Sequence, residues 1–384
     1  MTASTGTLSP RSTRLSGPAA SVDHRGSWVP SGRMVAARFH ELRKRRGLML
    51  LLAGVTVGLP TVYLALRLIL HAAAPNTYGT AGGYNVYVGL VAGVLYVFGF
   101  IVAATLGATA GSVDFTEGMF RHHVITGRSR LALYFARIPA GLGIIVPLVA
   151  IGFTIVCTVC VFAAPSTLNY NGATLPAQLS RAQLVQWAEQ HPNEVVNNFP
   201  LRLYPGEVPN QACLPGGGPP KANLQPSSGP CTPAQLRALA VIVADGAYSD
   251  YSRYFLSPSV SLMIKSGLWI ELEAAVAFLI GLGLSSLLGQ RTVAVVLMIV
   301  LELIVTPLAV RAHLPHMVNL QRAVIGAATA HVEPGGLPTP FGGGSPSDQA
   351  MALHETTTVA VCVILGWIVV WTALGAWRMA TRDT

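Results

Sequence analysis

Six long apolar runs alternate with polar segments along the chain. The runs lie near residues 48–70, 84–110, 132–163, 260–288, 292–311 and 357–377. A helix needs roughly 20 residues to cross a hydrocarbon layer about 30 Å thick, and every run reaches that length. The pattern therefore predicts an all-α polytopic membrane protein with six transmembrane helices.

The residues ahead of the first run divide into two parts. Residues 1–30 are rich in Ser, Thr, Gly, Pro and Arg and contain no apolar run, which predicts a disordered tail. Residues 31–47 place Val35, Phe39 and Leu42 on one side of a helix, with basic side chains opposite. This spacing predicts an amphipathic helix that lies in the lipid headgroup layer. A plain basic flank that happens to be helical is the alternative.

Residues 164–258, between the third and fourth runs, are far more numerous than an ordinary connection needs. Helical periodicity recurs over 180–190 and 232–251, behind Ser180 and Thr232, which are favourable N-cap residues. We therefore predict a small, mostly helical insertion between spans 3 and 4, with an irregular loop as the alternative.

The distribution of charge sets the orientation in the membrane. Charged residues make up only 11% of the chain, less than half the share in soluble proteins. Of the 25 Lys and Arg residues, 16 lie on the side of the two termini, whereas 164–257 and 312–355 hold five and one. The positive-inside rule puts both termini in the cytoplasm. The net charge of +9 is thus a feature of membrane flanks and not of a nucleic-acid-binding surface.

These inferences give a complete predicted organisation. It comprises a cytoplasmic tail (1–30), an amphipathic helix (31–47), spans 1–3 (48–163) with a cytoplasmic segment (111–131), an extracytoplasmic cap (164–258), spans 4 and 5 (259–311), an extracytoplasmic loop (312–355), and span 6 with a short cytoplasmic end (356–384). The predicted location is the cell membrane.

Ionisable side chains inside the runs are costly at membrane depth and are therefore candidates for function. Glu302 lies mid-run, where a structural pairing and a substrate contact are equally compatible with its position. Glu271 and Glu273 are two residues apart and point to nearly opposite helix faces, which excludes a carboxylate dyad between them. We expect one of them to line a cavity and the other to meet the cap or the headgroups. Lys265 is expected near the outer headgroups, beside Trp269.

The five cysteines predict at most one disulfide. Cys157, Cys160 and Cys362 lie inside apolar runs, where cysteine usually behaves as a small hydrophobe. Cys213 and Cys231 lie in a polar segment rich in Pro and Gly, and are the only pair placed to form a disulfide, provided that the segment is extracytoplasmic.

Enzyme motifs are missing from the sequence. It contains no G-x-x-x-x-G-K-[ST] phosphate loop, no H-E-x-x-H zinc pair and no G-x-S-x-G nucleophile elbow. We therefore predict no catalytic residue, no metal site and no cofactor in this chain. If ATP drives its action, another chain binds the ATP.

The segment after the second run has a distinctive order of residues. Asp114 and Glu117-Gly118 are followed by Thr126-Gly127-Arg128-Ser129-Arg130 at the start of the third run. In this order, in its six spans, in the helix ahead of span 1 and in the segment LQRAVIGAATA (320–330) between spans 5 and 6, the chain resembles the permease subunits of type-2 ATP-binding-cassette (ABC) exporters. Two positions differ, because Met119 stands where that family usually has Thr and Gly127 where Pro is common.

The resemblance implies an export permease that forms a homodimer or a heterodimer in the lipid bilayer and docks two copies of a separate ATPase, which carries ATP and Mg. It also implies that a short helix near 112–125 couples the permease to the ATPase, and that 320–330 belong to a re-entrant helical hairpin. The implied coupling residues are Asp114, Phe115, Glu117, Gly118, Met119, Phe120 and Arg121.

Two other functions fit the sequence. The first is a non-transport envelope protein that acts through its extracytoplasmic cap. The second is an integral membrane enzyme that modifies lipid, with Glu302 and the outer acidic residues as its reactive groups.

Overall fold

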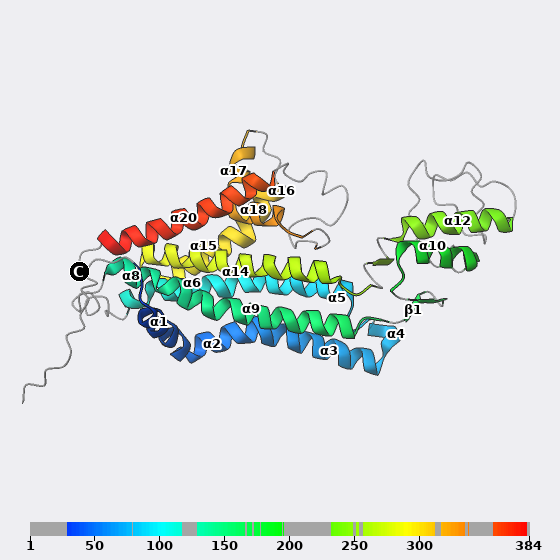
Figure 1. The fold of residues 1–384 in the computed structure, drawn as a ribbon, viewed down its shortest axis with the longest axis horizontal. Helices are drawn as coiled ribbons and strands as arrows, with labels where there is room; N and C mark the ends of the chain where they lie inside the picture. The colour runs from blue at the N-terminus through cyan, green and yellow to red at the C-terminus, as the bar shows by residue number, and fades with distance from the viewer. Residues whose placement is uncertain are drawn as a thin grey trace, which may run out of the picture.

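A bundle of six long helices dominates the computed structural model (Figure 1). The structure describes residues 29–78, 80–116, 129–165, 167–170, 173–176, 178–193, 195, 232–248, 251–252, 256–311, 316–334, 337 and 356–381. Within these residues, the helices long and apolar enough to cross a membrane are Arg46–Ala73, Tyr84–Val113, Arg130–Phe162, Val260–Leu288, Arg291–Ala309 and Thr357–Thr381. The prediction of six apolar spans is confirmed.

Three of the spans contain a π-helical turn, in which backbone hydrogen bonds skip one residue more than in an α-helix. Span 1 is α2 (Arg46–Ala53), η1 (Gly54–Gly58) and α3 (Leu59–Ala73), followed by the short α4 (Pro75–Tyr78). Span 2 is α5 (Tyr84–Val88), η2 (Gly89–Tyr96) and α6 (Val97–Thr116); span 3 is α8 (Arg130–Phe135) and α9 (Arg137–Phe162). Span 4 is α14 (Val260–Leu288), span 5 is α15 (Arg291–Val300), η3 (Leu301–Val305) and α16 (Thr306–Arg311), and span 6 is α20 (Thr357–Thr381). Such turns are frequent at functional sites.

Spans 2 and 4 form the centre of the bundle. In each, 67% of the most apolar window is buried, against 22–33% in the other four spans. Glycines permit this close approach, since a Cβ on Gly281 of α14 would lie 2.6 Å from the carbonyl oxygen of Ala104 in α6. Gly283 faces the backbone of Trp371 in α20 in the same way. The remaining spans surround this pair, with exposed apolar side chains suited to lipid.

The amphipathic helix predicted before span 1 is α1 (Gly32–Lys44). It packs against α9 and buries Met34, Arg38 and Leu42, while Val35 and Phe39 are half-buried. The apolar face is therefore close to the predicted one, but it includes a buried arginine. Arg38 remains there because its Nη1 donates to Glu41 Oε2 at 2.7 Å.

The insertion between spans 3 and 4 has its own apolar core. Helices α10 (Arg181–Gln190) and α12 (Pro233–Gly246) pack together and lie beyond the ends of the bundle helices (Figure 1). Ser180 and Thr232 each form a capping box at the start of their helix, as predicted. The Arg181 guanidinium pairs with Asp245 across the two helices and lowers the pKa of that carboxyl.

The mostly helical insertion also contains a β-hairpin, which the sequence pattern did not lead us to expect. Strands β1 (Thr167–Tyr170) and β2 (Ala173–Pro176) pair antiparallel. The Tyr251 hydroxyl, buried after α12, donates to Pro176 O at 2.6 Å and accepts from Leu179 N at 3.1 Å. This hydroxyl attaches the hairpin to the helical core of the insertion.

Two short helices, α17 (Val318–Arg322) and α18 (Ile325–His331), lie between spans 5 and 6. Residues 325–329 of α18 are buried against α16 and α20. Indole groups hold the pair in place: Trp269 Nε1 donates to Thr329 O at 3.0 Å, and Trp367 Nε1 donates to Ala323 O at 2.8 Å. The α17–α18 pair is thus an integral part of the bundle.

Candidate functional site

One end of the bundle holds α1, α8 and the last turns of α20 (Figure 1). We call it the basic end, because these elements, their flanks and the start of α15 contribute Arg33, Arg38, His40, Arg43, Lys44, Arg45, Arg46, Arg130, Arg137, Arg291 and Arg378. The connection between spans 2 and 3 begins and ends here, as the sequence predicts. α6 continues to Thr116, so that Asp114 and Phe115 belong to its last turns. Glu117, Gly118, Met119, Phe120 and Arg121 lie outside the described residues.

Both flanks of this connection are attached to the bundle. The buried Arg137, at the start of α9, donates from Nη1 to the carbonyl oxygen of Gly111 in α6 at 3.0 Å. The same oxygen accepts from Ser286 Oγ of α14 at 3.4 Å. On the other flank, Arg130 Nη1 donates to Ala380 O of α20 at 3.3 Å. A displacement of the connection would therefore act on spans 2, 3, 4 and 6 together.

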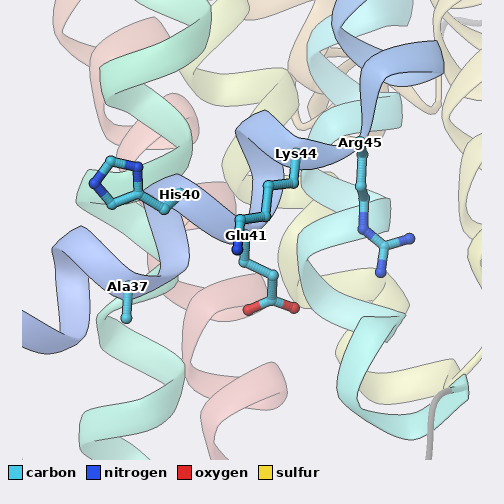
Figure 2. Close-up of a pocket in the computed structure, with 5 residues that line it drawn as sticks. All are labelled: Ala37, His40, Glu41, Lys44 and Arg45. Carbon is cyan, nitrogen blue, oxygen red and sulfur yellow. The ribbon is translucent and has the colours of Figure 1, made fainter.

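Helix α1 packs beside these flanks. Arg38, Glu41 and Leu42 of α1 enclose a small void together with Ala110 and Val113 of α6 and Arg137 of α9. The outer side of α1 borders an open hollow of about 560 Å³, lined by Ala37, His40, Glu41, Lys44 and Arg45 (Figure 2). The lining residues recur at intervals of three or four, so they form one stripe along the helix. The stripe is mostly basic and suits the headgroup layer of a membrane.

A second group of polar side chains is buried inside the bundle. Glu302, in the π-helical turn η3, is only 1% exposed, and its Oε1 accepts a hydrogen bond from the Tyr96 hydroxyl at 2.6 Å. Tyr96 stacks on Trp269 with ring centroids 4.9 Å apart and 5° between the planes. Trp269 in turn binds Thr329 of α18. We call Tyr96, Trp269, Glu273, Glu302 and Thr329, together with the half-buried Glu333, the buried polar cluster.

Glu273 of α14 belongs to this cluster. It is 2% exposed and close enough to Glu302 and Glu333 for their charges to act on it. Glu273 Oε1, Glu302 Oε2 and Glu333 Oε1 are buried without a hydrogen-bond partner. An ionised group in the middle of a membrane helix costs roughly 2.5–3.5 kcal/mol on insertion scales. Burial also raises the pKa of Glu333, which lies beyond α18, to about 8.

The predicted intramembrane candidates separate in the structure. Glu271 is half-buried, whereas Glu273 is buried, in agreement with their predicted opposite faces. Lys265 is exposed near the start of α14. Glu302 is buried as predicted, and its partner is Tyr96, which the sequence analysis did not single out. A tyrosine in the middle of an apolar run is a usable signal, because a buried hydroxyl needs a hydrogen-bond partner.

The structure describes three of the five cysteines. Cys213 and Cys231 lie outside the described residues. Cys157, Cys160 and Cys362 form no disulfide. Cys157 is half-buried, Cys160 is buried, and Cys362 is exposed on α20. Over the described parts of the chain, no group of three His, Cys, Asp or Glu residues could hold a metal ion.

The cap carries an open hollow of its own. It measures about 710 Å³ and is lined by Glu189, Gln190, Pro192, Arg237, Ala238 and Val241 from α10, α12 and the residues after α10.

Comparison with protein-family models, curated proteins and solved structures finds no match to this chain. Its function has therefore to be inferred from the arrangement of its own residues.

Proposed function

We propose that the chain is the membrane-spanning permease subunit of a type-2 ABC exporter in the cell membrane. It moves its substrate across the bilayer as a homodimer or heterodimer, driven by two copies of a separate ATPase that binds ATP and Mg. The observation that carries the proposal is the position of three elements in a six-span bundle. These are α1 before span 1, the ends of α6 and α8 that flank the connection between them, and the α17–α18 pair between spans 5 and 6.

The flanks of the α6–α8 connection support a coupling role. Because Gly111 O accepts from Arg137 of α9 and Ser286 of α14, a force on residues 117–128 reaches the central spans through short, direct contacts. Arg130 extends the same path to α20. A partner that moves on ATP binding would thus shift the bundle from one arrangement to another. Such a shift changes the relative populations of the two arrangements.

Helix α1 supports the same proposal from the lipid side. Its basic stripe of His40, Lys44 and Arg45 is suited to lipid phosphates, while its buried face contacts α9 and the end of α6. A helix that is held both by the headgroups and by the spans beside the connection gives those spans a fixed point in the membrane plane. Movement of the connection is then converted into rearrangement of the bundle instead of rotation of the whole protein.

The test is purification of the tagged chain from its native membrane in a mild detergent. We expect an ATPase with a G-x-x-x-x-G-K-[ST] motif to co-purify at one copy per permease chain, and ATP hydrolysis to elute with the complex. Purification of the intact, folded chain with no such ATPase would contradict the proposal. It would favour a role for the cap and its hollow between α10 and α12.

A further inference from the structure

The buried polar cluster contains more acceptors than donors. Tyr96 donates to Glu302 and Trp269 donates to Thr329 O, and the hydroxyls of Thr329 and Thr306 lie beside Glu273 and Glu302 respectively. Glu273 Oε1 and Glu302 Oε2 still have no donor. An ionised carboxylate has only acceptor oxygens, so two ionised neighbours cannot satisfy each other. Protonation of one of them creates the missing O–H donor.

Among the residues that the structure describes, no positively charged group is placed to substitute for this proton. Glu273 and Glu302 act on each other, Glu333 also acts on Glu273, and Tyr96 acts on Glu302. On the described elements packed around the cluster, the other charged or titratable side chains are Lys265 and Glu271 of α14, Arg322 of α17, His331 of α18, Arg137 of α9, Arg291 of α15 and Arg378 of α20. None of these acts on Glu273 or Glu302, and in the described part of the chain neither carboxylate forms an ion pair.

The position of the two carboxylates gives the proton a structural consequence. Glu273 belongs to α14, where the charge of Glu333 acts on it and where Trp269, one turn earlier, binds Thr329 of α18. Glu302 belongs to η3, which is followed by Thr306, and the Thr306 side chain lies against Gly326 of α18. Loss of protons would place like charges at the junction of these elements, where burial makes their repulsion strong. Both residues are almost completely buried, and a proton is a ligand that needs no cavity around it.

We propose that Glu273 and Glu302 form a proton-binding site inside the bundle, and that the bound proton holds the α17–α18 pair against α14. The proton is taken from water and returned to water, with no other change of bonding. At neutral pH the site is occupied; as the pH rises, ionisation of the pair and of Glu333 loosens the α17–α18 pair. This inference does not depend on the proposed export function, because it needs only the described contacts.

Infrared spectroscopy of the purified full-length chain tests whether the proton is bound. We expect a carbonyl band of protonated carboxyl groups at neutral pH, which shifts in heavy water, unlike the ester band of lipid. The double variant Glu273→Gln/Glu302→Gln should lose the equivalent of at least one protonated carboxyl per chain. Glu271→Gln is the matched control, since it lies on the same helix but faces away, and it should leave the band unchanged.

Hydrogen exchange tests the structural consequence. Wild type and double variant are compared at the same pH, so that the intrinsic rate of exchange cancels. Glu333, whose pKa burial raises to about 8, is present in both proteins, so its ionisation cancels as well. At about pH 9 the amides of α18 should exchange about tenfold faster in wild type than in the double variant, the factor that corresponds to one pKa unit of coupling between the charge of the pair and the packing of α18. At about pH 6, where the proposal has the site occupied by its proton, the two rates should be equal.

Two results would overturn the inference. One is a wild-type spectrum at neutral pH without a protonated carboxyl band, a measurement that does not depend on any variant folding correctly. The other concerns the exchange rate of the α18 amides in wild type divided by the rate in a folded double variant. If this ratio is the same at both pH values, the inference fails. Absence of an ATPase partner would leave both measurements intact, so failure of the export proposal can be told apart from failure of this one.

Discussion

Replacing Gly107 with alanine is expected to lower the free energy of unfolding by about 3 kcal/mol, at the upper end of the usual range for overpacking. A Cβ at this position of α6 would overlap the carbonyl oxygen of Phe278 and lie 2.9 Å from Leu282 N, both in α14. These are backbone atoms, so the clash is relieved only if the two central helices separate. The measurement is the thermal unfolding midpoint and the yield of monodisperse protein in detergent.

Gly99→Ala is the matched control for this prediction. Gly99 lies two turns earlier on α6 and is also buried, but a Cβ there meets nothing within 4 Å. Because alanine has the higher helix propensity, by about 1 kcal/mol, this variant should be as stable as the wild type or more stable. Equal stability of the two variants would show that the α6–α14 contact is looser than described.

Gly118→Pro is expected to uncouple ATP hydrolysis from movement of the bundle while the protein still inserts and binds its ATPase. Residue 118 lies outside the described residues, within the helix that the sequence predicts near 112–125. Proline in a helix interior removes a hydrogen bond and costs about 3 kcal/mol, so the helix would break. The measurement compares ATP-dependent changes in hydrogen exchange of the spans with the rate of ATP hydrolysis in the same complex. Hydrolysis should persist and the exchange changes should disappear.

Gly127→Pro provides the control for that variant. It also introduces a proline into the connection, but at a position where the resembled permeases commonly carry one, just before α8. We expect normal coupling in this variant. If Gly118→Pro kept its ATP-dependent exchange changes, or if both proline variants lost them equally, the segment near 112–125 would not be the coupling helix.

The spans were predictable because length and hydropathy alone decide them. The predicted run 260–288 coincides with α14, and the run 357–377 differs from α20 by four residues at one end. N-caps were equally predictable, since Ser180 and Thr232 act through side-chain oxygens close in sequence. The β-hairpin was missed, although Asn171-Gly172 between its strands is the dipeptide most typical of such turns.

The buried polar cluster was only partly predictable. Burial of Glu302 followed from its place in an apolar run, but its bond to Tyr96 joins residues 206 positions apart. No local pattern specifies such a contact. The π-helical turns η2 and η3 also shift the register of the residues that follow them, so an ideal 100° rotation misplaces side chains there. Burial of Arg38 was not predicted either, because it depends on the side-chain pairing with Glu41.

The most direct test of the export proposal is photo-crosslinking of the complex in its native membrane. A photoreactive amino acid replaces Gly118 in the α6–α8 connection, and, in a separate control, the exposed Glu189 of α10 in the cap. The account predicts that position 118 forms an adduct with an ATPase that carries a phosphate loop, and that position 189 forms none. An ATPase adduct at position 189, or no ATPase adduct at position 118 in a correctly inserted protein, would contradict it.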